Sequence, residues 1–156
     1  MLAKPYHYLA SGLDNIFLLN GVTESETAYG PMVHIENING LHHAIGLHIV
    51  EKAEPMKGAE FRFLRKQMSL SQLQLAELLR VTDQTVANYE KEKTSLGAAE
   101  AYIRDHYLIS ILPEQTRVGI IKAMTAAPIK QVRKKLPDVP RRTIVEQWRE
   151  EPRLAA

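Results

Sequence analysis

The stretch that decides the fold is Phe61-Arg-Phe-Leu-Arg-Lys-Gln-Met-Ser-Leu-Ser-Gln-Leu-Gln-Leu-Ala-Glu-Leu-Leu-Arg-Val-Thr-Asp-Gln-Thr-Val-Ala-Asn-Tyr-Glu-Lys91. Ser71 and Thr82 each precede an apolar pattern with helical spacing, and both residue types favour the N-cap of a helix. Only Arg80 and Val81 separate the first predicted helix from the second cap. So short a joint makes the two helices cross sharply and lets the second helix project. Their predicted inward positions are Leu75, Ala76, Leu79, Val86 and Tyr89.

The outward face of the second predicted helix carries short polar side chains, at Asp83, Gln84, Thr85 and Asn88. Gln and Asn bind adenine through a paired donor and acceptor, whereas Asp accepts a hydrogen bond from cytosine N4. We therefore predict that these four side chains read base edges in the major groove of double-stranded DNA.

Groups suited to the DNA backbone surround this face. Gln72 stands at the start of the preceding helix, where the positive end of the helix dipole favours a phosphate. Lys91 and Lys93 follow the second helix, and Arg80 precedes its cap. We predict phosphate contacts at these four residues.

The motifs of this stretch resemble the Cro/repressor-like helix-turn-helix regulators, also called the XRE family. The resemblance covers residues 59–96 and rests on Leu70-Ser71-Gln72, Leu75-Ala76, Val81-Thr82, Val86 and Tyr89-Glu90-Lys91, in one order at fixed spacing. It implies an all-helical DNA-binding domain, with base contact at Gln84, Thr85 and Asn88 and phosphate contact at Gln72 and Lys93.

Two positions depart from the pattern of that family. Arg80 stands where the turn usually has glycine, which would cost on the order of 1 kcal/mol if the backbone is left-handed there. Lys91-Glu92-Lys93 replace the glycine that usually follows the Tyr-Glu pair. We therefore expect the exit loop to differ.

The first 54 residues predict a small antiparallel sheet with one helix. Residues 15–22 are rich in strand-forming apolar residues and end on the turn dipeptide Asn20-Gly21. After a break at Tyr29-Gly30-Pro31, apolar residues alternate with polar ones, which is the period of a strand. These alternating residues are Val33, Ile35 and Ile38. Residues 41–50 return to helical spacing, with Leu41, Ile45 and Ile49 on one face.

The chain as a whole predicts an α+β fold in three parts. Residues 1–54 form the β-containing N-terminal domain, or head. Residues 55–112 form the all-α repressor-like helix-turn-helix domain, after a linker predicted at Glu54-Pro55-Met56-Lys57-Gly58. Residues 113–156 form a helical and basic C-terminal extension, with one helix at 114–126 and a short one at 143–150.

A further helix is predicted at residues 98–112, at the end of the DNA-binding domain. Its aliphatic and aromatic positions are numerous for a small domain: Ala99, Tyr102, Ile103, His106, Tyr107 and Ile111. Part of this surface would face a second copy, or all of it would serve the intramolecular core. Because paired helix-turn-helix modules span half-sites about 34 Å apart, we expect a homodimer on a palindromic operator.

Charge is distributed unevenly along the chain. Residues 1–55 hold two Lys or Arg against six Asp or Glu, whereas residues 114–156 hold ten against five. The layout of an acidic head before a repressor-like domain resembles the MqsA-type antitoxins, whose heads bind zinc through cysteines. That resemblance implies a toxin as a protein partner of the head. The basic run at 130–142 suggests either a phosphate-contacting arm or a solvated tail, and Leu154-Ala155-Ala156 resembles the end of a degradation tag.

Several classes of protein are disfavoured by composition. The chain has no cysteine, which excludes disulfides, thiolate nucleophiles and cysteine zinc sites. His42, His43 and His48 lack the i, i+4 spacing of a helical metal site, so we expect neither a metal nor another cofactor. Ser11, Asp14 and His7 do not lie in a nucleophile elbow or a phosphate-cradling loop, so no enzyme is expected. No apolar run approaches the roughly 18 residues of a membrane span, and a cytoplasmic protein without a membrane partner is expected.

The sequence thus favours a DNA-binding transcriptional regulator that represses its own or a neighbouring promoter. Two alternatives stay open. In one, the head neutralises a toxin and the helix-turn-helix autoregulates the pair. In the other, the head binds a metabolite and the protein is a ligand-sensing regulator.

Overall fold

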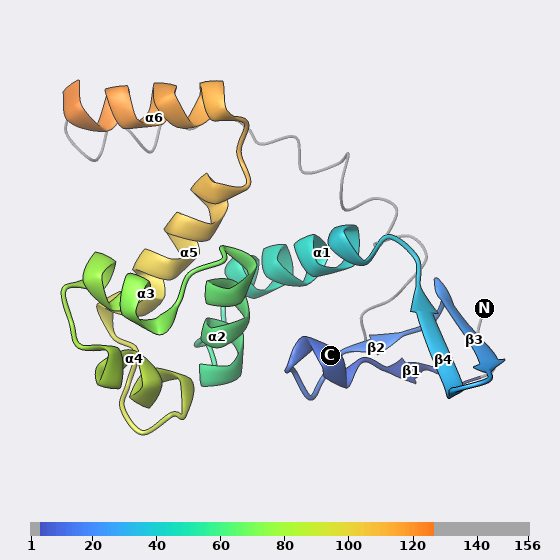
Figure 1. Ribbon diagram of the computed structural model, residues 1–156. Helices are drawn as coiled ribbons and strands as arrows, with labels where there is room; N and C mark the ends of the chain where they lie inside the picture. Colours follow the sequence, from blue (N-terminus) through green and yellow to red (C-terminus); the bar gives the residue numbers. More distant parts are fainter. Residues whose placement is uncertain (1–3, 127–156) are drawn as a thin grey trace.

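The computed structural model describes residues 4–126, which form an α+β fold as the sequence predicted. Its helices are α1 (Ile38–Glu51), α2 (Gly58–Gln67), α3 (Gln72–Leu79), α4 (Asp83–Glu90), α5 (Ala98–Ser110) and α6 (Glu114–Ala126). Its strands are β1 (Tyr6–His7), β2 (Phe17–Leu18), β3 (Val22–Thr27) and β4 (Gly30–Ile35), with a 3-10 turn η1 (Leu9–Ser11) after β1. The strands lie at one end of the molecule, α3 and α4 at the other, and α1 runs between them (Figure 1).

The predicted head sheet is two separate antiparallel ribbons, β1–β2 and β3–β4. Each strand of the first ribbon is only two residues long, with Tyr6 opposite Leu18. The strand expected at 15–22 is therefore interrupted: β2 covers part of it, and β3 begins at Val22 after the turn at Gly21. Gly21 has φ +68°, a backbone that glycine adopts without steric cost.

The β3–β4 ribbon projects from the molecule with its side chains mostly exposed. Only Val22 at its base is buried, where it lies opposite Ile35. The expected break at residues 29–31 is the ribbon's turn, and β4 begins within it at Gly30. Ile38 is not part of this strand, contrary to the alternating pattern, because Asn37 caps the next helix with its side chain and ends the extended backbone.

Helix α1 carries the apolar face that its spacing predicted. Leu41, Ile45 and Ile49 are buried in a core shared by the head and the helical domain. Leu18 of β2 and Phe61 and Leu64 of α2 belong to the same core. The head therefore rests on the helical domain rather than standing apart from it.

Arg104 of α5 fixes the chain where α1 ends. Its guanidinium donates to the carbonyl oxygens of Ile49, Val50 and Lys52 at 2.9–3.1 Å through Nη1 and to that of Glu54 at 3.1 Å through Nη2. The last carbonyls of a helix lack partners within the helix, and here one side chain satisfies two of them, those of Ile49 and Val50. The linker expected at residues 54–58 is thus held against α5 at its start.

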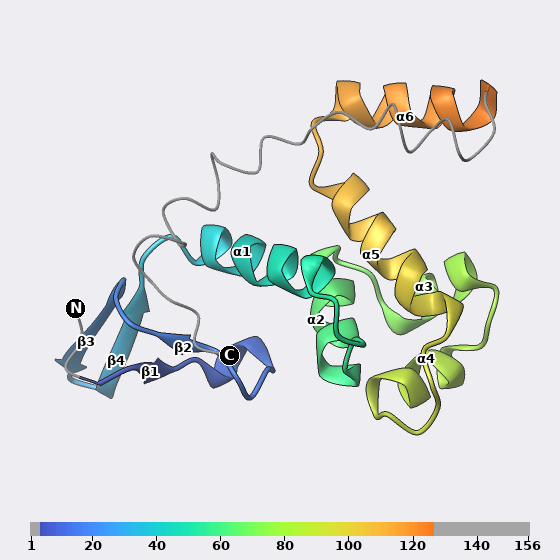
Figure 2. The same cartoon turned by 180° about the vertical axis from the view of Figure 1, so that it is seen from behind.

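Two further contacts hold the segment between α1 and α2 in place. The amide of Met56 donates to Glu100 of α5, and Lys52 forms a 2.8 Å ion pair with Glu60 of α2. Figure 2, seen from behind, shows α1 and α5 both lying against α2 at this junction.

Helix α5 lies over α1 and α2 in the intramolecular core. Ala99, Ile103 and Tyr107 are buried, while Tyr102 and Ile111 are half-buried and pack against the same core. The three buried residues therefore do not supply the surface for a second copy that the sequence left open. After Pro113, α6 begins where it was expected and extends away from α3 and α4 (Figure 1).

The predicted basic run at 130–142, the short helix at 143–150 and the tag-like end at 154–156 lie outside the described residues. Within residues 4–126, no helix has the length and apolar character needed to cross a membrane.

Candidate nucleic-acid interface

Helices α3 and α4 each begin with the capping chemistry that the sequence indicated. The hydroxyl of Ser71 accepts from the amide of Gln74, whose side chain in turn accepts from the amide of Ser71, forming a capping box. Thr82 caps α4 by accepting from the amide of Thr85 at 3.1 Å. Both helix starts are therefore fixed by their own sequence.

Arg80 adopts the left-handed backbone that the missing turn glycine implied. Its φ and ψ are 56° and 43°, at the C-cap of α3. The amide of Val81 donates back to the carbonyl of Ala76, which closes the last turn of α3. The sharp crossing of α3 and α4 is thus kept at a local steric cost of about 1–2 kcal/mol.

A buried carboxylate at the end of α4 ties the three helices together. Glu90 Oε1 accepts from Arg65 Nε of α2 at 2.6 Å, and Glu90 Oε2 accepts from Gln72 Nε2 of α3 at 2.9 Å. The Glu90 side chain is 6% exposed. Arg65 also donates to the carbonyl of Leu70, in the turn before α3. These bonds set the angle at which α4 leaves the domain.

The predicted base-reading residues lie on the outer side of α4. Asp83 and Gln84 are exposed, and Thr85 and Asn88 are half-buried. The structure brings two of them together, since Gln84 Nε2 donates to Asn88 Oδ1 at 3.1 Å. Thr85 shares a 2.9 Å hydrogen bond with the hydroxyl of Thr82. This face can both donate and accept hydrogen bonds.

The predicted phosphate-binding residues flank α4 on both sides. Arg80, Lys91 and Lys93 are exposed. Gln72 is half-buried at the start of α3, and its amide group already donates to Glu90. Its backbone amide is at the first position of the helix, where no carbonyl within the helix is available to accept from it.

Sequence reasoning missed Arg65, Glu90 and Arg62. The signal for Arg65 and Glu90 was present: Arg65 follows Phe61 and Leu64 on one helical face, which places a charge among inward positions. A buried charge requires a partner, and Glu90 supplies it. Arg62 carries an exposed cation, 58% accessible, with Nε 4.0 Å from Glu90 Oε2. It therefore lies on the same side of the domain as Gln72.

The exit from α4 is formed by Lys91-Glu92-Lys93, the residues that stand where the resembling family usually has glycine. Glu92 takes a left-handed backbone with φ 56° in place of the glycine. Its carboxylate accepts from the amide of Gly58 at 2.8 Å, at the start of α2. A Cβ at Gly58 would lie 2.5 Å from the Glu90 carbonyl oxygen and 2.7 Å from that of Tyr89. Glycine is therefore required where α2 meets the end of α4.

The residues of the other candidate sites make hydrogen bonds within the fold. His7 Nε2 lies 2.9 Å from the carbonyl oxygen of Asp14 rather than from its carboxylate, and Ser11 donates to the carbonyl of Tyr8. His42 is hydrogen-bonded to Tyr8 and Gln67 inside the fold. No group of three or more His, Asp or Glu suited to a metal ion occurs between residues 4 and 126.

Comparison with known families finds a match to part of the chain. Residues 61–103, from α2 through the first half of α5, match the family model described as Helix-turn-helix. A search of curated proteins and a search of solved structures each find no match. The matched range holds every base-contacting and phosphate-contacting residue predicted above.

Proposed function

We propose that this chain, which carries a Cro/repressor-like DNA-binding helix-turn-helix at residues 61–103, is a transcriptional repressor that covers a promoter by binding a palindromic operator. The observation that supports the proposal is the outer side of α4, where four polar side chains stand between exposed cations. Base edges are recognised by such polar groups and phosphates by such cations.

In this proposal α4 enters the major groove with its N-terminal half first. Gln84 and Asn88 contact adenine, and the hydrogen bond between their side chains orients both amides in the DNA-free protein. Asp83 accepts from cytosine, and Thr85 contacts a neighbouring base edge. Each bidentate contact discriminates against a wrong base by about 1–3 kcal/mol.

The backbone contacts come from the elements on both sides of α4. The start of α3, with the amide and side chain of Gln72, binds one phosphate with help from the helix dipole. Lys91, Lys93 and Arg80 bind others, and Arg62 adds a further cation on the side of Gln72.

We propose that the repressor binds as a homodimer, because a palindromic operator presents two half-sites about 34 Å apart. The dimer surface lies outside the buried side of α5, which the intramolecular core occupies. Light scattering of the free protein, together with a footprint on the selected operator, tests this stoichiometry.

Selection of bound DNA from a random pool tests the assignment of the reading face. Wild type should yield one motif, whereas Gln84→Ala and Asn88→Ala should each lose preference at particular base positions. Gln115→Ala, an equivalent change at an exposed site on α6, is the matched control and should select the wild-type motif. Selection of the same motif at the same strength by all four proteins would show that α4 does not read the operator through these residues.

A second function is favoured by the β3–β4 ribbon. Tyr29 at its tip is fully exposed, and Met32 and Val33 are exposed beside it. Exposed apolar side chains on a free ribbon mark a surface for a protein partner. Glu24 and Glu26 lie on the same ribbon, so the partner that fits is a basic protein, and we propose a toxin neutralised by the head.

Co-expression with a small basic protein encoded beside this chain tests that candidate. A stable complex should form with wild type and be lost with Tyr29→Ala plus Met32→Ala, while operator affinity stays unchanged. The control is Leu73→Ala on α3, which removes an apolar side chain about as exposed as that of Met32. If the ribbon variant instead abolishes self-association, the ribbon binds a second copy and the toxin-binding proposal is wrong.

A further inference from the structure

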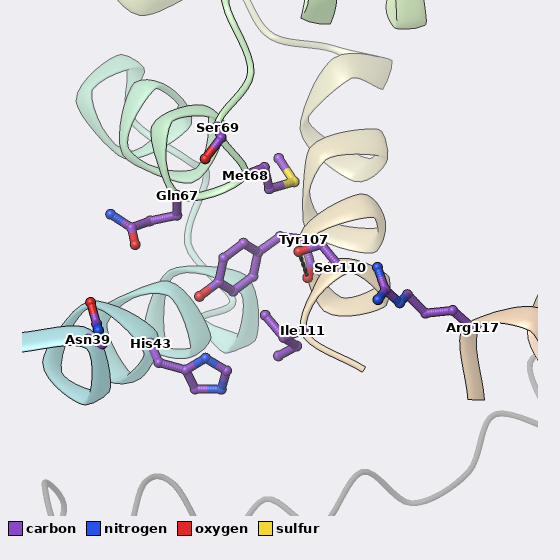
Figure 3. Close-up of a pocket in the computed structure, with 9 residues that line it drawn as sticks. All are labelled: Asn39, His43, Gln67, Met68, Ser69, Tyr107, Ser110, Ile111 and Arg117. Atoms are coloured by element: carbon purple, nitrogen blue, oxygen red, sulfur yellow. Dashed lines mark hydrogen bonds between the residues drawn. The ribbon is translucent and has the colours of Figure 1, made fainter. Parts of the chain in front are cut away.

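A pocket of about 400 Å³ lies on the side of the molecule where α1, the end of α2, α5 and α6 approach one another. Figure 3 shows Asn39 and His43 on α1, Gln67 and Ser69 at the end of α2, and Arg117 reaching back from α6 toward α5. This volume is within the range of small-molecule sites. The pocket contains none of the residues assigned to DNA.

The floor of the pocket is set by a close approach of two helices. Tyr107 of α5 places its hydroxyl against Gly46 of α1, where a Cβ would overlap it. The buried ring of Tyr107 therefore closes the base of the pocket, between α1 and the end of α2 (Figure 3). Met68 and Ile111 complete an apolar surface beside it.

Arg117 supplies the unusual feature of this pocket. Its Nε is buried and has no hydrogen-bond partner among the described residues. Buried donors in folded proteins nearly always have a partner, and an orphan one indicates a bound water or ligand. Because the guanidinium stays charged at all ordinary pH values, its missing partner is best matched by an anion.

The charges of the residues that line the pocket also favour an anionic ligand. The pocket is lined by one arginine and by no Asp or Glu. Burial lowers the pKa of His43 below 6.5, so this residue is neutral at pH 7 and leaves Arg117 as the cation of the site. Asn39, Gln67 and Ser69 offer neutral hydrogen-bonding groups on the opposite wall.

We propose that this pocket binds a small anion that carries a carboxylate or phosphate group. A carboxylate or phosphate group of the ligand pairs with the Arg117 guanidinium, and its polar body bonds to Asn39, Gln67 and Ser69. The half-buried side chains of Met68 and Ile111 contact its carbon atoms. An arginine with a carboxylate or phosphate forms a charge-assisted pair that is about twice as strong as a neutral hydrogen bond.

Titration of the full chain with citrate, inorganic phosphate and glycerol tests the proposal, at constant ionic strength set by sodium chloride. The arginine Nε–H signals in a ¹⁵N NMR spectrum report directly on Arg117. At least one of the two anions should shift the Arg117 signal in a saturable manner, and neutral glycerol should not. Calorimetry then gives the affinity of the anion that binds.

Variants separate this site from unspecific attraction of anions. Arg117→Gln should weaken binding about tenfold or more, since a charge-assisted pair is lost. Asn39→Ala, on the opposite wall, should weaken binding about threefold. Lys66→Gln removes one exposed cation outside the pocket and is the matched control, with an expected change of less than about twofold.

Three results would overturn the proposal. The first is the absence of a saturable shift with both anions, which would mean that water satisfies Arg117. The second is equal affinity in wild type and Arg117→Gln. The third is an equal response to glycerol. Because the DNA-reading residues lie elsewhere, each of these results leaves the proposed repressor function standing.

Discussion

Arg65 and Glu90, 25 residues apart in the chain, form a 2.6 Å ion pair inside the helix-turn-helix. Their side chains are 10% and 6% exposed. Arg65 comes from α2, Glu90 ends α4, and the second carboxylate oxygen of Glu90 binds Gln72 of α3. The cluster of Arg65, Glu90 and Gln72 therefore fixes the orientation of α4 relative to α2 and α3.

Removing either partner of this pair should destabilise the fold strongly. Arg65→Met or Glu90→Gln leaves a buried charge without its counter-charge, which typically costs about 3–5 kcal/mol. Urea denaturation followed by circular dichroism measures the loss. Arg62→Gln is the control, because Arg62 is exposed and 4.0 Å from Glu90, and it should change the stability by less than about 0.5 kcal/mol. A loss below 1 kcal/mol for both pair variants would contradict the assigned role.

The strained joint between α3 and α4 predicts a stabilising substitution. Arg80 has φ 56°, so Arg80→Gly should relieve steric strain and raise the free energy of unfolding by about 0.5–1 kcal/mol, after the greater entropy of unfolded glycine is included. Arg80→Ala keeps the strain and serves as the control. Thermal melts of the three proteins make the comparison, and equal melting temperatures for the glycine and alanine variants would argue against strain.

Glycine-to-alanine substitution should have opposite effects on stability at Gly58, where α2 contacts the end of α4, and at Gly119 of α6. Gly58→Ala puts a methyl group 2.5 Å from a backbone oxygen, and overpacking of this kind costs about 1–3 kcal/mol. Gly119→Ala, in the interior of α6 with nothing near its Cβ position, should stabilise by about 0.5–1 kcal/mol. Denaturation midpoints that move in the same direction for both variants would contradict the close approach at Gly58.

The proposed phosphate contacts predict a change in the salt dependence of DNA binding. Each phosphate contact steepens the plot of log affinity against log salt by about 0.9. In a homodimer, Lys91→Gln or Lys93→Gln should therefore lower the slope by about 1.8. Fluorescence anisotropy at several salt concentrations measures it. Lys4→Gln, an exposed lysine in the head, should leave the slope unchanged, and an unchanged slope in both test variants would remove these contacts from the interface.

The half-buried His42, which is hydrogen-bonded to Tyr8 and Gln67, predicts an acid-sensitive fold. Burial lowers the pKa of His42 below 6.5, so as the pH falls below 6.5 the unfolded chain takes up the proton first and the folded state loses stability. The Nδ1 of His42 accepts from Gln67, a bond that protonation removes. Denaturation between pH 7.5 and pH 5 should show this loss and a smaller one in His42→Gln. His34→Gln on the exposed ribbon is the control and should behave as wild type.

The helix-turn-helix could be predicted almost completely from sequence, because its signals are local. Ser71 and Thr82 cap the helices that follow them, and the backbone at Arg80 is left-handed as the absent glycine implied. Caps and turns depend on a few neighbouring residues, so one sequence is enough to locate them. The roles of the outer residues of α4 toward DNA stay predictions.

The parts that could not be predicted depend on contacts distant in sequence. The pairing of Arg65 with Glu90 and the four carbonyls held by Arg104 join residues 25–55 positions apart. No local period encodes such partners. The head was predicted as one sheet and is two ribbons, since the short strands β1 and β2 pair only with each other.

The length of α1 affects how the β3–β4 ribbon is oriented relative to α4, because Arg104 holds the end of α1 in place. Both ends of α1 are fixed, by the ribbons at its start and by α5 at its end, and helices α2 to α4 are mounted on the same core. An α-helix turns by about 100° and rises about 1.5 Å per residue. The number of residues in α1 therefore sets the rotational phase between the β3–β4 ribbon and α4. Deleting one residue from α1 would change that phase by about 100°, so the head and helices α2 to α4 would no longer fit together in the shared core.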